Sequence, residues 1–333
     1  MRAQDWEIPP QVLSGDTADI YFIRTVDVLK AEGLNPVATM EFFASGRGGI
    51  LCGIRQAVSL LRQVLPVDGC EVWGLSEGDA FSKKEVVLRV TAPYQSYGVY
   101  ETALLGMMAH CSGWATAARE IVDAAAPIPV ISFGARHVHP LVAGVMDYSA
   151  MVGGCVGGSS VEGARLAGTP AAGTMPHALI ICFGDTVEAT LAFDCHMPPD
   201  VPRVSLVDTF KDEAEESLRV AAALGDRLQG VRLDTPSERG RVTPDLVKEV
   251  RARLDQAGYR HVKIFVSGGV DVDRVRAFRE AGAPVDSFGV GSYISAAPPI
   301  DFTADIHQID GRPVAKRGRI PGITSNPRLK RLL

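Results

Sequence analysis

The sequence predicts an α/β protein that combines an irregular, incomplete α/β barrel with a second α+β domain. From about Pro127 onward, short runs of β-branched residues alternate with amphipathic helical patterns, which is typical of a parallel α/β arrangement. Before Pro127 the alternation is less regular, which indicates a separate α+β domain. We expect residues 1–101, joined by the C-terminal tail 299–333, to form the α+β domain and residues 102–298 to form the barrel.

Composition limits the classes of function. The chain has 333 residues, 46% hydrophobic and 22% charged, enough to bury one large core or two ordinary ones. The formal net charge of -5 gives no general attraction to nucleic acid or anionic lipid, so we expect no nucleic-acid and no membrane partner. The first residues lack the apolar segment of a signal peptide, and no stretch approaches the roughly 20 apolar residues of a membrane span. We therefore expect a soluble, cytoplasmic protein whose anionic ligands need a local basic pocket.

The six cysteines are scattered, and no two of them form a C-x-x-C pair. A structural zinc site of the usual spacing is therefore not expected, and reduced thiols fit best. The neighbours Cys195 and His196 form a conceivable metal pair, but two adjacent loop residues more often bind nothing. We predict no metal ligands among the side chains.

The first element of the predicted barrel domain is a helix. Residues 100–125, YETALLGMMAHCSGWATAAREIVDAA, form an Ala-rich helical stretch that links the two domains. Ser112 and Gly113 predict a kink or break within this stretch.

Six strands are predicted after this helix, and a helix follows most of them. The strand candidates are PVISFGAR (to Arg136), AAGTMPH (to His177), RVSLVD (to Asp208), GVRLD (to Asp234), VKIFVSGG (to Gly269) and SFGVGS (to Ser292). One connecting helix is capped by Thr243 and ends at Gly258; the next is capped by Asp271 or Asp273 and ends at Gly282.

Polar and glycine residues fall at the carboxyl ends of these strands, where parallel α/β barrels gather their active-site groups. Each of them alone could be an ordinary cap or turn residue. Six such positions in step predict one active face, formed by Arg136, His177, Asp208, Asp234, Ser267-Gly268-Gly269 and Gly289-Val290-Gly291-Ser292.

Motifs in a fixed order run through nearly the whole chain: SGDTADIYFIRT, YETALLG, SFGARHVHP, GGCVGGSSVEGARLAGTPAAGTMPHALI, SLVDTF, VRLDTP, VSGGVD, FGVGSYI, DFTADI and GRPVAKRGR. In these motifs the chain resembles the nicotinate phosphoribosyltransferases, which are type II phosphoribosyltransferases related to the nicotinamide and quinolinate enzymes. The resemblance implies the transfer of phosphoribose from phosphoribosyl pyrophosphate to nicotinate, which forms nicotinate mononucleotide and pyrophosphate for NAD biosynthesis by salvage.

For the pyridine ring, the resemblance implies that Phe133 lies on one side and Tyr21 of a second subunit on the other. Stacked aromatic pairs contribute about 0.5–1.5 kcal/mol each beyond burial, enough to orient a small ring. Arg136 would hold the substrate carboxylate, since a planar donor fork suits that anion. The alternatives are an ordinary barrel side chain for Phe133 and a structural ion pair for Arg136.

Ser159 bears on whether the substrate is the acid nicotinate or the amide nicotinamide. The nicotinamide-using relatives place an aspartate where this chain has Ser159. A carboxylate about 4 Å from that of nicotinate would cost about 4 kcal/mol at an effective dielectric of 20. Ser159 therefore favours nicotinate over nicotinamide, and quinolinate, with a second carboxylate, would need more cations than the FGAR segment supplies.

For the phosphoribosyl donor, the resemblance assigns Asp208 to the catalytic region near the ribose. It assigns Arg232 and Asp234 to the ribose hydroxyls and adjoining phosphates. Glycines let backbone N–H groups approach the 5′-phosphate, and two glycine pairs follow consecutive strands. The predicted phosphate-binding residues are Ser267, Gly268, Gly269, Gly289, Gly291 and Ser292.

His177 aligns with the histidine that ATP phosphorylates in the nicotinate and nicotinamide enzymes, so ATP is implied as co-substrate and Mg²⁺ as cofactor. A satisfied buried histidine is the alternative. Because Tyr21 would have to come from a neighbour, the resemblance also implies a homodimer or larger assembly with shared active sites. Lys316, Arg317 and Arg319 could contact pyrophosphate or ATP phosphates, and a solvated basic tail is the alternative.

Two residues depart from the family pattern. Family members commonly carry a second arginine where this chain has His137, and an aspartate where it has Val156. We also expect no C-terminal zinc-binding extension of the kind that some relatives carry. The remaining alternatives are a related enzyme for another pyridine such as quinolinate, a catalytically idle binding homologue, and a general phosphate-binding barrel; the last leaves Phe133 and Tyr21 without a purpose.

Overall fold

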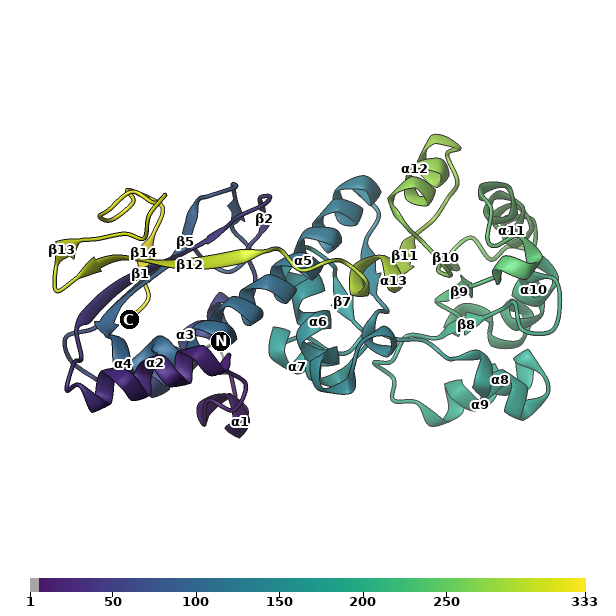
Figure 1. The fold of residues 1–333 in the computed structure, drawn as a ribbon. Coiled ribbons are helices and arrows are strands. Elements are labelled where there is room, and N and C mark those ends of the chain that lie inside the picture. The colour runs from purple at the N-terminus through teal and green to yellow at the C-terminus, as the bar shows by residue number, and fades with distance from the viewer. Residues whose placement is uncertain (1–5) are drawn as a thin grey trace. The chain divides into compact units, whose positions relative to one another are not determined.

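The computed structural model describes residues 6–333, so the first five residues of the predicted N-terminal domain lie outside the described part of the chain. The chain divides into two compact units (Figure 1). The first unit comprises the N-terminal part up to Thr116 together with the C-terminal segment Ala297–Leu333, and the second unit comprises Ala117–Ala296. The predicted boundary at 101–102 coincides with the first residue of α5, Glu101–Ala125, and stays a prediction.

The first unit is built on an antiparallel sheet in the order β13-β12-β1-β5-β3-β14. Strands β12 and β14 belong to the C-terminal tail, and they pair with β1 and β3 of the N-terminal part. The bounds are β1 Val37–Ala44, β3 Glu71–Gly74, β5 Val86–Pro93, β12 Phe302–Ile309, β13 Arg312–Pro313 and β14 Lys330–Arg331, with a separate pair β2 Gly49–Ile50 and β4 Ala80–Phe81. The prediction of an α+β domain completed by the tail is confirmed.

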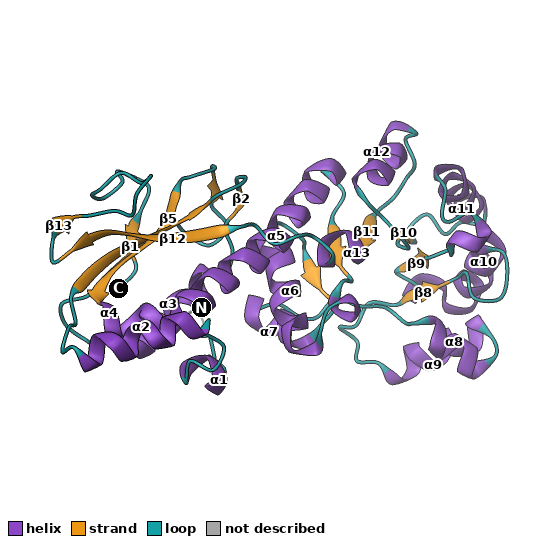
Figure 2. Cartoon of the chain, in the orientation of Figure 1, coloured by secondary structure: helices purple, strands orange, loops and turns teal. Residues whose placement is uncertain are grey.

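Helices cover one face of this sheet (Figure 2). They are α2 Ile20–Ala31, α3 Ile54–Val64 and α4 Tyr94–Tyr97, which the 3₁₀ turn Gly98–Tyr100 follows. The short helix α1 Pro10–Leu13 precedes them and buries no residue. Helix α3 illustrates why the helices pack on the sheet. Its apolar residues recur on one side, and six residues between Ile54 and Leu61 are buried.

Helix α5 is continuous through Ser112 and Gly113, so the predicted break is wrong. The Ser112 hydroxyl accepts a hydrogen bond from the backbone N–H of Cys52 at 3.0 Å, which ties the helix to a neighbouring loop. A Cβ atom at residue 113 would stand 2.4 Å from the carbonyl oxygen of Pro298. Gly113 therefore serves close packing against another segment and not a break in the helix.

The second unit is built on a parallel sheet in the order β7-β6-β11-β10-β9-β8, with β7 and β8 as its two free edges. The bounds are β6 Val130–Ser132, β7 Gly157–Gly158, β8 Val204–Leu206, β9 Gly230–Leu233, β10 Lys263–Val266 and β11 Ser287–Val290. Because the two edges do not pair, the sheet is an incomplete barrel. The predicted fold class is confirmed.

The predicted strand AAGTMPH is not formed. Residues 169–176 are irregular, and His177 begins helix α8, His177–Phe183. One ladder-like bond remains, from the N–H of Ala172 to the carbonyl of Gly158 in β7 at 2.9 Å. Pro176 has no N–H to donate to a ladder, which is one physical reason why the pairing does not extend.

Helices connect the parallel strands in sequence. They are α6 Pro140–Val152, α7 Val161–Ala167, α8, α9 Thr186–His196, α10 Glu213–Leu224, α11 Pro244–Gln256, α12 Val272–Glu280 and α13 Ser292–Ser295, with 3₁₀ turns Ala135–His137, Gly225–Arg227 and Ser237–Arg239. The predicted caps of α11 and α12 are confirmed: Thr243 accepts from the N–H of Leu246, and Asp271 accepts from that of Arg274. In the described residues, no helix is long and apolar enough to cross a bilayer.

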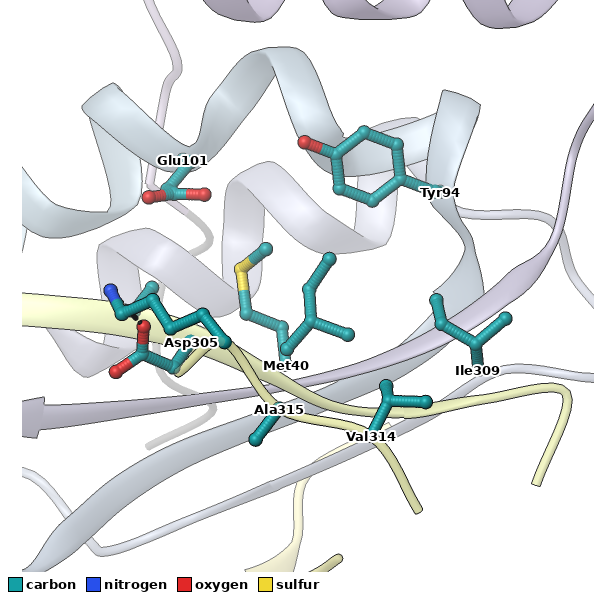
Figure 3. A pocket seen from close by; sticks show the side chains of 10 residues that line it. Met40, Tyr94, Glu101, Asp305, Ile309, Val314 and Ala315 are labelled. Atoms are coloured by element: carbon teal, nitrogen blue, oxygen red, sulfur yellow. Dashed lines mark ion pairs between the residues drawn. The ribbon is translucent and has the colours of Figure 1, made fainter. Parts of the chain in front are cut away.

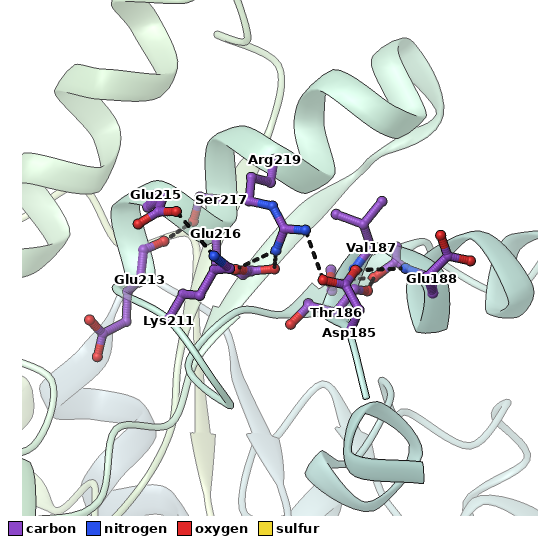
Figure 4. Close-up of polar contacts among 12 residues, drawn as sticks. Asp185, Thr186, Val187, Glu188, Lys211, Glu213, Glu215, Glu216, Ser217 and Arg219 are labelled. Carbon is purple, nitrogen blue, oxygen red and sulfur yellow. Dashed lines mark hydrogen bonds and ion pairs between the residues drawn. The ribbon is translucent and has the colours of Figure 1, made fainter. Parts of the chain in front are cut away.

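A charged cluster fixes α9 against α10 (Figure 4). Asp185 caps α9 by accepting from the N–H groups of Val187 and Glu188. Its second oxygen accepts from Arg219 of α10 at 2.8 Å, and Arg219 also pairs with buried Glu216 at 2.7 Å. This contact orients the α8–α9 segment, at whose start His177 lies.

Candidate active site

Most of the predicted site residues of the second unit lie just beyond the carboxyl ends of its parallel strands. Phe133 follows β6, Asp208 follows β8, and Asp234 follows β9. The Ser267–Gly269 turn follows β10, and Gly291 with Ser292 follows β11. Since parallel strands end at the same edge of a sheet, one rim carries these residues.

His177 stands opposite two carboxylates. Its Nδ1 lies 2.9 Å from the hydroxyl of Thr209, while its Nε2 lies 3.7 Å from Asp208 Oδ1 and 3.9 Å from Asp234 Oδ2. The imidazole is 38% exposed, so it is not a buried core histidine. One ring nitrogen is held by Thr209, and the other faces the acids and open space.

Asp208 is a buried carboxylate with one oxygen free. Its side chain is 1% exposed, and its Oδ2 accepts from the backbone N–H of Asp234 at 2.6 Å. Among the described residues, Oδ1 has no hydrogen-bond partner. Burial raises the pKa of this carboxyl, and the neighbouring charge of Asp234 raises it further, against the lowering effect of the Asp234 N–H and of His177. A buried acceptor without a partner is rare and marks a place where a ligand can bind.

Arg232 connects the acid pair with the aromatic residue. Its guanidinium carbon lies 5.6 Å from the ring centroid of Phe133, and Nη2 donates to the carbonyl of Met175 at 3.1 Å. The buried Nε has no acceptor in the described part of the chain. Burial lowers the pKa of Arg232, and the positive charge of Arg136 contributes in the same direction.

Gly289 makes room for the ring of Phe133. A Cβ atom at residue 289 would stand 2.4 Å from Cε2 of that ring. The backbone N–H of Phe133 donates to the carbonyl of Val290 at 2.7 Å, which fixes the start of the loop after β6. The structure thus supplies a packing reason for this glycine, beside the predicted contact with phosphate.

Arg136 lies in the 3₁₀ turn after Phe133, and its side chain is exposed. Within residues 6–333 it forms no salt bridge, so its guanidinium is available to an anion. His137 lies next to it and approaches Gly291, where a Cβ atom would stand 3.2 Å from His137 Nε2.

Ser159 rests on a carboxylate that the sequence reasoning missed. Asp147 of α6 is fully buried; it accepts from the hydroxyl of Ser132 and from the N–H of Ser160 at 2.7 Å each. The hydroxyl of Ser159 donates to the same carboxylate at 3.4 Å. Asp147 therefore joins the end of β6, next to Phe133, to the turn that carries Ser159. A lone aspartate inside the apolar helix PLVAGVMDYSAMV was the available signal.

The turn after β10 has two consecutive residues with positive φ, Gly268 at 85° and Gly269 at 64°. A Cβ atom at residue 268 would stand 2.8 Å from Oδ1 of Asp234, so this turn packs directly against the acid pair. Ser267 is buried and donates its N–H to the carbonyl of Leu233 at 2.8 Å. Ser292 begins the short helix α13.

Tyr21 lies in the first unit, on α2, and its side chain is 56% exposed. Its hydroxyl donates to Asp19 at 3.3 Å, and Thr102 donates to the same Asp19 oxygen at 3.1 Å. No group of three or more metal-ligating side chains occurs in the chain from residue 6 onward.

Two family models match the chain one after the other. The N-terminal domain of quinolinate phosphoribosyl transferase matches residues 19–112, and the C-terminal domain matches residues 114–305. Together they cover the second structural unit and most of the N-terminal part of the first.

Curated proteins and solved structures agree with these models. Nicotinate phosphoribosyltransferase pncB1 of Mycobacterium tuberculosis is 32% identical over 354 residues, which cover 95% of this chain and 77% of that protein. The pncB2 enzyme of the same organism is 33% identical over 72% of this chain, and the match spans about half, 52%, of that relative's length.

Among solved structures, nicotinate-nucleotide pyrophosphorylase from Pyrococcus furiosus has a TM-score of 0.87 at 42% identity, over 97% of this chain and 82% of that one. Sequence motifs, both family models and the fold thus agree, and they confirm the resemblance to nicotinate phosphoribosyltransferases. The chain belongs to the quinolinate phosphoribosyl transferase family, the type II phosphoribosyltransferases.

Proposed function

We propose that this chain is a nicotinate phosphoribosyltransferase, which joins nicotinate to phosphoribosyl pyrophosphate in the salvage branch of NAD biosynthesis. The observation that carries the proposal is that Phe133 and exposed Arg136 lie on the same strand-end rim as buried Asp208 and half-buried Asp234. An aromatic face next to a free guanidinium suits a planar ring with one carboxylate. Curated relatives at 32–33% identity bear the same activity in their names.

In the proposed reaction, the pyridine nitrogen forms a bond to ribose C1 while the bond from C1 to the pyrophosphate oxygen breaks. Phe133 orients the ring, and Arg136 binds its carboxylate. The carboxylates of Asp208 and Asp234 bind the ribose diol and stabilise the positive charge that develops on the sugar. Positioning and charge stabilisation supply most of the rate enhancement in such a transfer.

Magnesium fits the same acid pair. Asp208 offers a buried oxygen without a partner in residues 6–333, and Asp234 lies beside it. Carboxylate oxygens are ligands that Mg²⁺ prefers, and it usually binds through one or two of them together with substrate phosphates. When bound, the ion would neutralise charge on the leaving pyrophosphate.

We further propose that His177 takes the γ-phosphoryl group of ATP. With the proton on Nδ1, that nitrogen donates to the hydroxyl of Thr209, and the lone pair at Nε2 is free. Nε2 then attacks the γ-phosphorus of ATP, and the bond between that phosphorus and the oxygen of the leaving ADP breaks. The open position of the ring supports this role.

The proposed active site is shared between copies of the chain. Phe133 leaves the second face of the pyridine ring to another aromatic group, and Tyr21 is exposed on α2 with its hydroxyl held by Asp19. A homodimer or larger assembly would let Tyr21 of a second copy cover the ring. Because the substrates are those of intracellular nucleotide metabolism, we place the enzyme in the cytoplasm.

Quinolinate is the second candidate substrate. The family models are named for it, and Arg232 with its unpaired Nε near Phe133 offers a second cation for a second carboxylate. Our proposal prefers nicotinate because Arg232 is buried and lies between Phe133 and the acid pair, where it faces the donor sugar.

The test is product formation with matched pyridines. Purified protein with phosphoribosyl pyrophosphate and Mg²⁺ receives nicotinate, quinolinate or nicotinamide, with and without ATP, and pyrophosphate and the mononucleotide are quantified. We expect release with nicotinate, stimulated by ATP, and a phosphate on wild-type protein that is acid-labile and absent from the His177→Ala variant. Pyrophosphate release with quinolinate but not with nicotinate would make quinolinate the substrate. No release with any of the three pyridines would indicate a binding homologue without this activity.

A further inference from the structure

A cavity of about 420 Å³ lies within the first unit, lined by residues of β1, α4, α5, β12 and the loop that follows β13 (Figure 3). No residue of the second unit lines it, so it is separate from the proposed active-site residues Phe133 and Asp208. Most of its lining is apolar and consists of Met40, Ala304, Ile306, Ile309, Val314 and Ala315. The polar groups of the lining belong to Tyr94, Glu101, Asp305 and Lys316.

Tyr94 brings a buried hydroxyl to this cavity. The residue is 7% exposed, and its ring packs edge-on against that of Tyr97 with the centroids 5.8 Å apart. Figure 3 shows the hydroxyl directed toward the side of the cavity where Glu101 lies. Within residues 6–333 this hydroxyl forms no hydrogen bond, although a buried tyrosine hydroxyl usually has a partner. It therefore offers a hydrogen bond to a molecule in the cavity.

Glu101 brings a carboxylate to the same space. In the described part of the chain, this carboxylate accepts no hydrogen bond and forms no ion pair. The pKa of Glu101 is raised to about 7, first by burial and then by the negative charges of Asp305 and Asp19, which outweigh the positive charge of Lys316. After burial, the charge of Glu101 also raises the pKa of Tyr94. A positive charge beside Glu101 would thus be favourable.

The cations near the cavity are held by Asp305. Lys316 forms an ion pair with one oxygen of this buried carboxylate, and Arg319 Nε donates to the other oxygen at 2.6 Å. Asp305 is therefore fully paired, whereas Glu101 is not. The position of a cation opposite Glu101 is left to a ligand.

We propose that this cavity binds a small organic cation, a primary ammonium group on a compact aromatic or aliphatic hydrocarbon. The ammonium group has three donors and no acceptor, so it can donate both to the Glu101 carboxylate and to the Tyr94 oxygen. The hydrocarbon would contact Met40, Ile306 and Val314. The volume lies in the range of small-molecule sites, about 300–1,000 Å³. The site is independent of the proposed phosphoribosyl transfer.

Phenethylamine tests the site. Phenethyl alcohol and phenylacetate serve as a neutral and an anionic probe with a similar hydrocarbon body. The methionines are isotope-labelled at the methyl carbon for NMR, and Met40→Leu identifies the Met40 signal, which reports on the cavity. At pH 8, where the amine and Glu101 are both charged, we expect phenethylamine to shift this signal saturably. Phenethyl alcohol should bind roughly tenfold more weakly or worse, and phenylacetate should not shift the signal.

Glu101→Gln keeps the shape of the side chain and removes its charge. At pH 8 it should weaken phenethylamine binding roughly 10- to 100-fold and abolish the preference over phenethyl alcohol. Tyr94→Phe should weaken binding roughly 2- to 10-fold, the effect of one hydrogen bond. Glu32→Gln, at the exposed end of α2, is the control and should stay within about twofold.

The pH dependence separates charge from shape. At pH 5 the wild-type protein should bind phenethylamine at least roughly tenfold more weakly than at pH 8, because Glu101 takes up a proton. The affinity of Glu101→Gln should be the same at both pH values. Equal affinity of the wild-type protein at pH 5 and pH 8 would overturn the proposal.

Ala304→Leu tests the location, because its larger side chain fills part of the cavity. It should abolish the shift caused by phenethylamine and leave the circular dichroism spectrum unchanged. The proposal would be overturned by the absence of a saturable Met40 shift in the wild-type protein, by equal affinity of the wild type and Glu101→Gln, or by undiminished binding in a folded Ala304→Leu variant. Tighter binding of phenylacetate would assign the cavity to anions at Lys316 and would overturn it as well.

Discussion

Glu101, the first residue of α5, lines a mostly apolar cavity of about 420 Å³ in the first unit (Figure 3). Met40, Tyr94 and Asp305 lie around the same space. Burial, together with the negative charges of Asp305 and Asp19, raises the pKa of Glu101 from 4.5 to about 7, and Lys316 acts in the opposite direction. Replacing Glu101 with glutamine should therefore stabilise the protein in a way that depends on pH.

The sign follows from proton binding. Since the pKa is higher in the folded than in the unfolded state, the folded protein binds the proton more tightly between these two values. The stabilising contribution is complete below about pH 4.5 and is lost as the pH rises through about 7. The full shift corresponds to about 3 kcal/mol, and partial exposure of the side chain reduces this to about 2 kcal/mol.

Glutamine resembles the protonated acid, so Glu101→Gln avoids the loss. At pH 8 the free energy of unfolding should rise by about 2 kcal/mol, and at pH 5 by only about 0.5 kcal/mol. Urea unfolding followed by tryptophan fluorescence at both pH values measures the difference. Glu32→Gln, at the exposed end of α2, is the control and should change stability by less than about 0.5 kcal/mol at either pH. An equal gain at pH 5 and pH 8, or a loss at pH 8, would refute the reasoning.

Four further substitutions test packing and the site. Gly289→Ala places a methyl group against the Phe133 ring, and the overpacking costs about 1–3 kcal/mol. The KM for nicotinate should therefore rise roughly 5- to 150-fold in initial-rate assays. An unchanged KM would contradict the predicted binding of the pyridine ring against Phe133. Asp147→Asn replaces a buried acceptor with an amide, so urea unfolding should show a loss of about 1–3 kcal/mol; equal stability would mean that the carboxylate is not needed. In α5, Gly113→Ala should destabilise by about 1–3 kcal/mol because its methyl group meets a backbone oxygen, whereas Gly106→Ala, with open space around it, should stabilise by about 0.5–1 kcal/mol; changes of the same sign would count against this packing.

Local patterns were sufficient to predict much of the parallel unit. The caps Thr243 and Asp271 predict the helices that begin directly after them, and five of the six predicted strands are present in the structure. Because strand ends of a parallel sheet meet at one rim, the sequence also placed Asp208 and Asp234 together, and the structure joins them through one hydrogen bond.

Features that depend on distant segments could not be predicted in the same way. The helix α5 continues through Gly113, where Pro298 packs closely against it, and no local pattern shows this contact. His177 begins a helix and reaches the acids from outside the sheet. Asp147 was missed because its partner, the turn at Ser159, comes next to it only once the chain is folded.

A crystal structure with bound nicotinate mononucleotide would test the central claim most directly, because one ligand reports on both ends of the site. We predict the pyridine ring against Phe133 with its carboxylate on Arg136, and the 5′-phosphate on the amides of Gly268 and Gly269. A ring bound away from Phe133, or a phosphate bound away from that turn, would contradict the account.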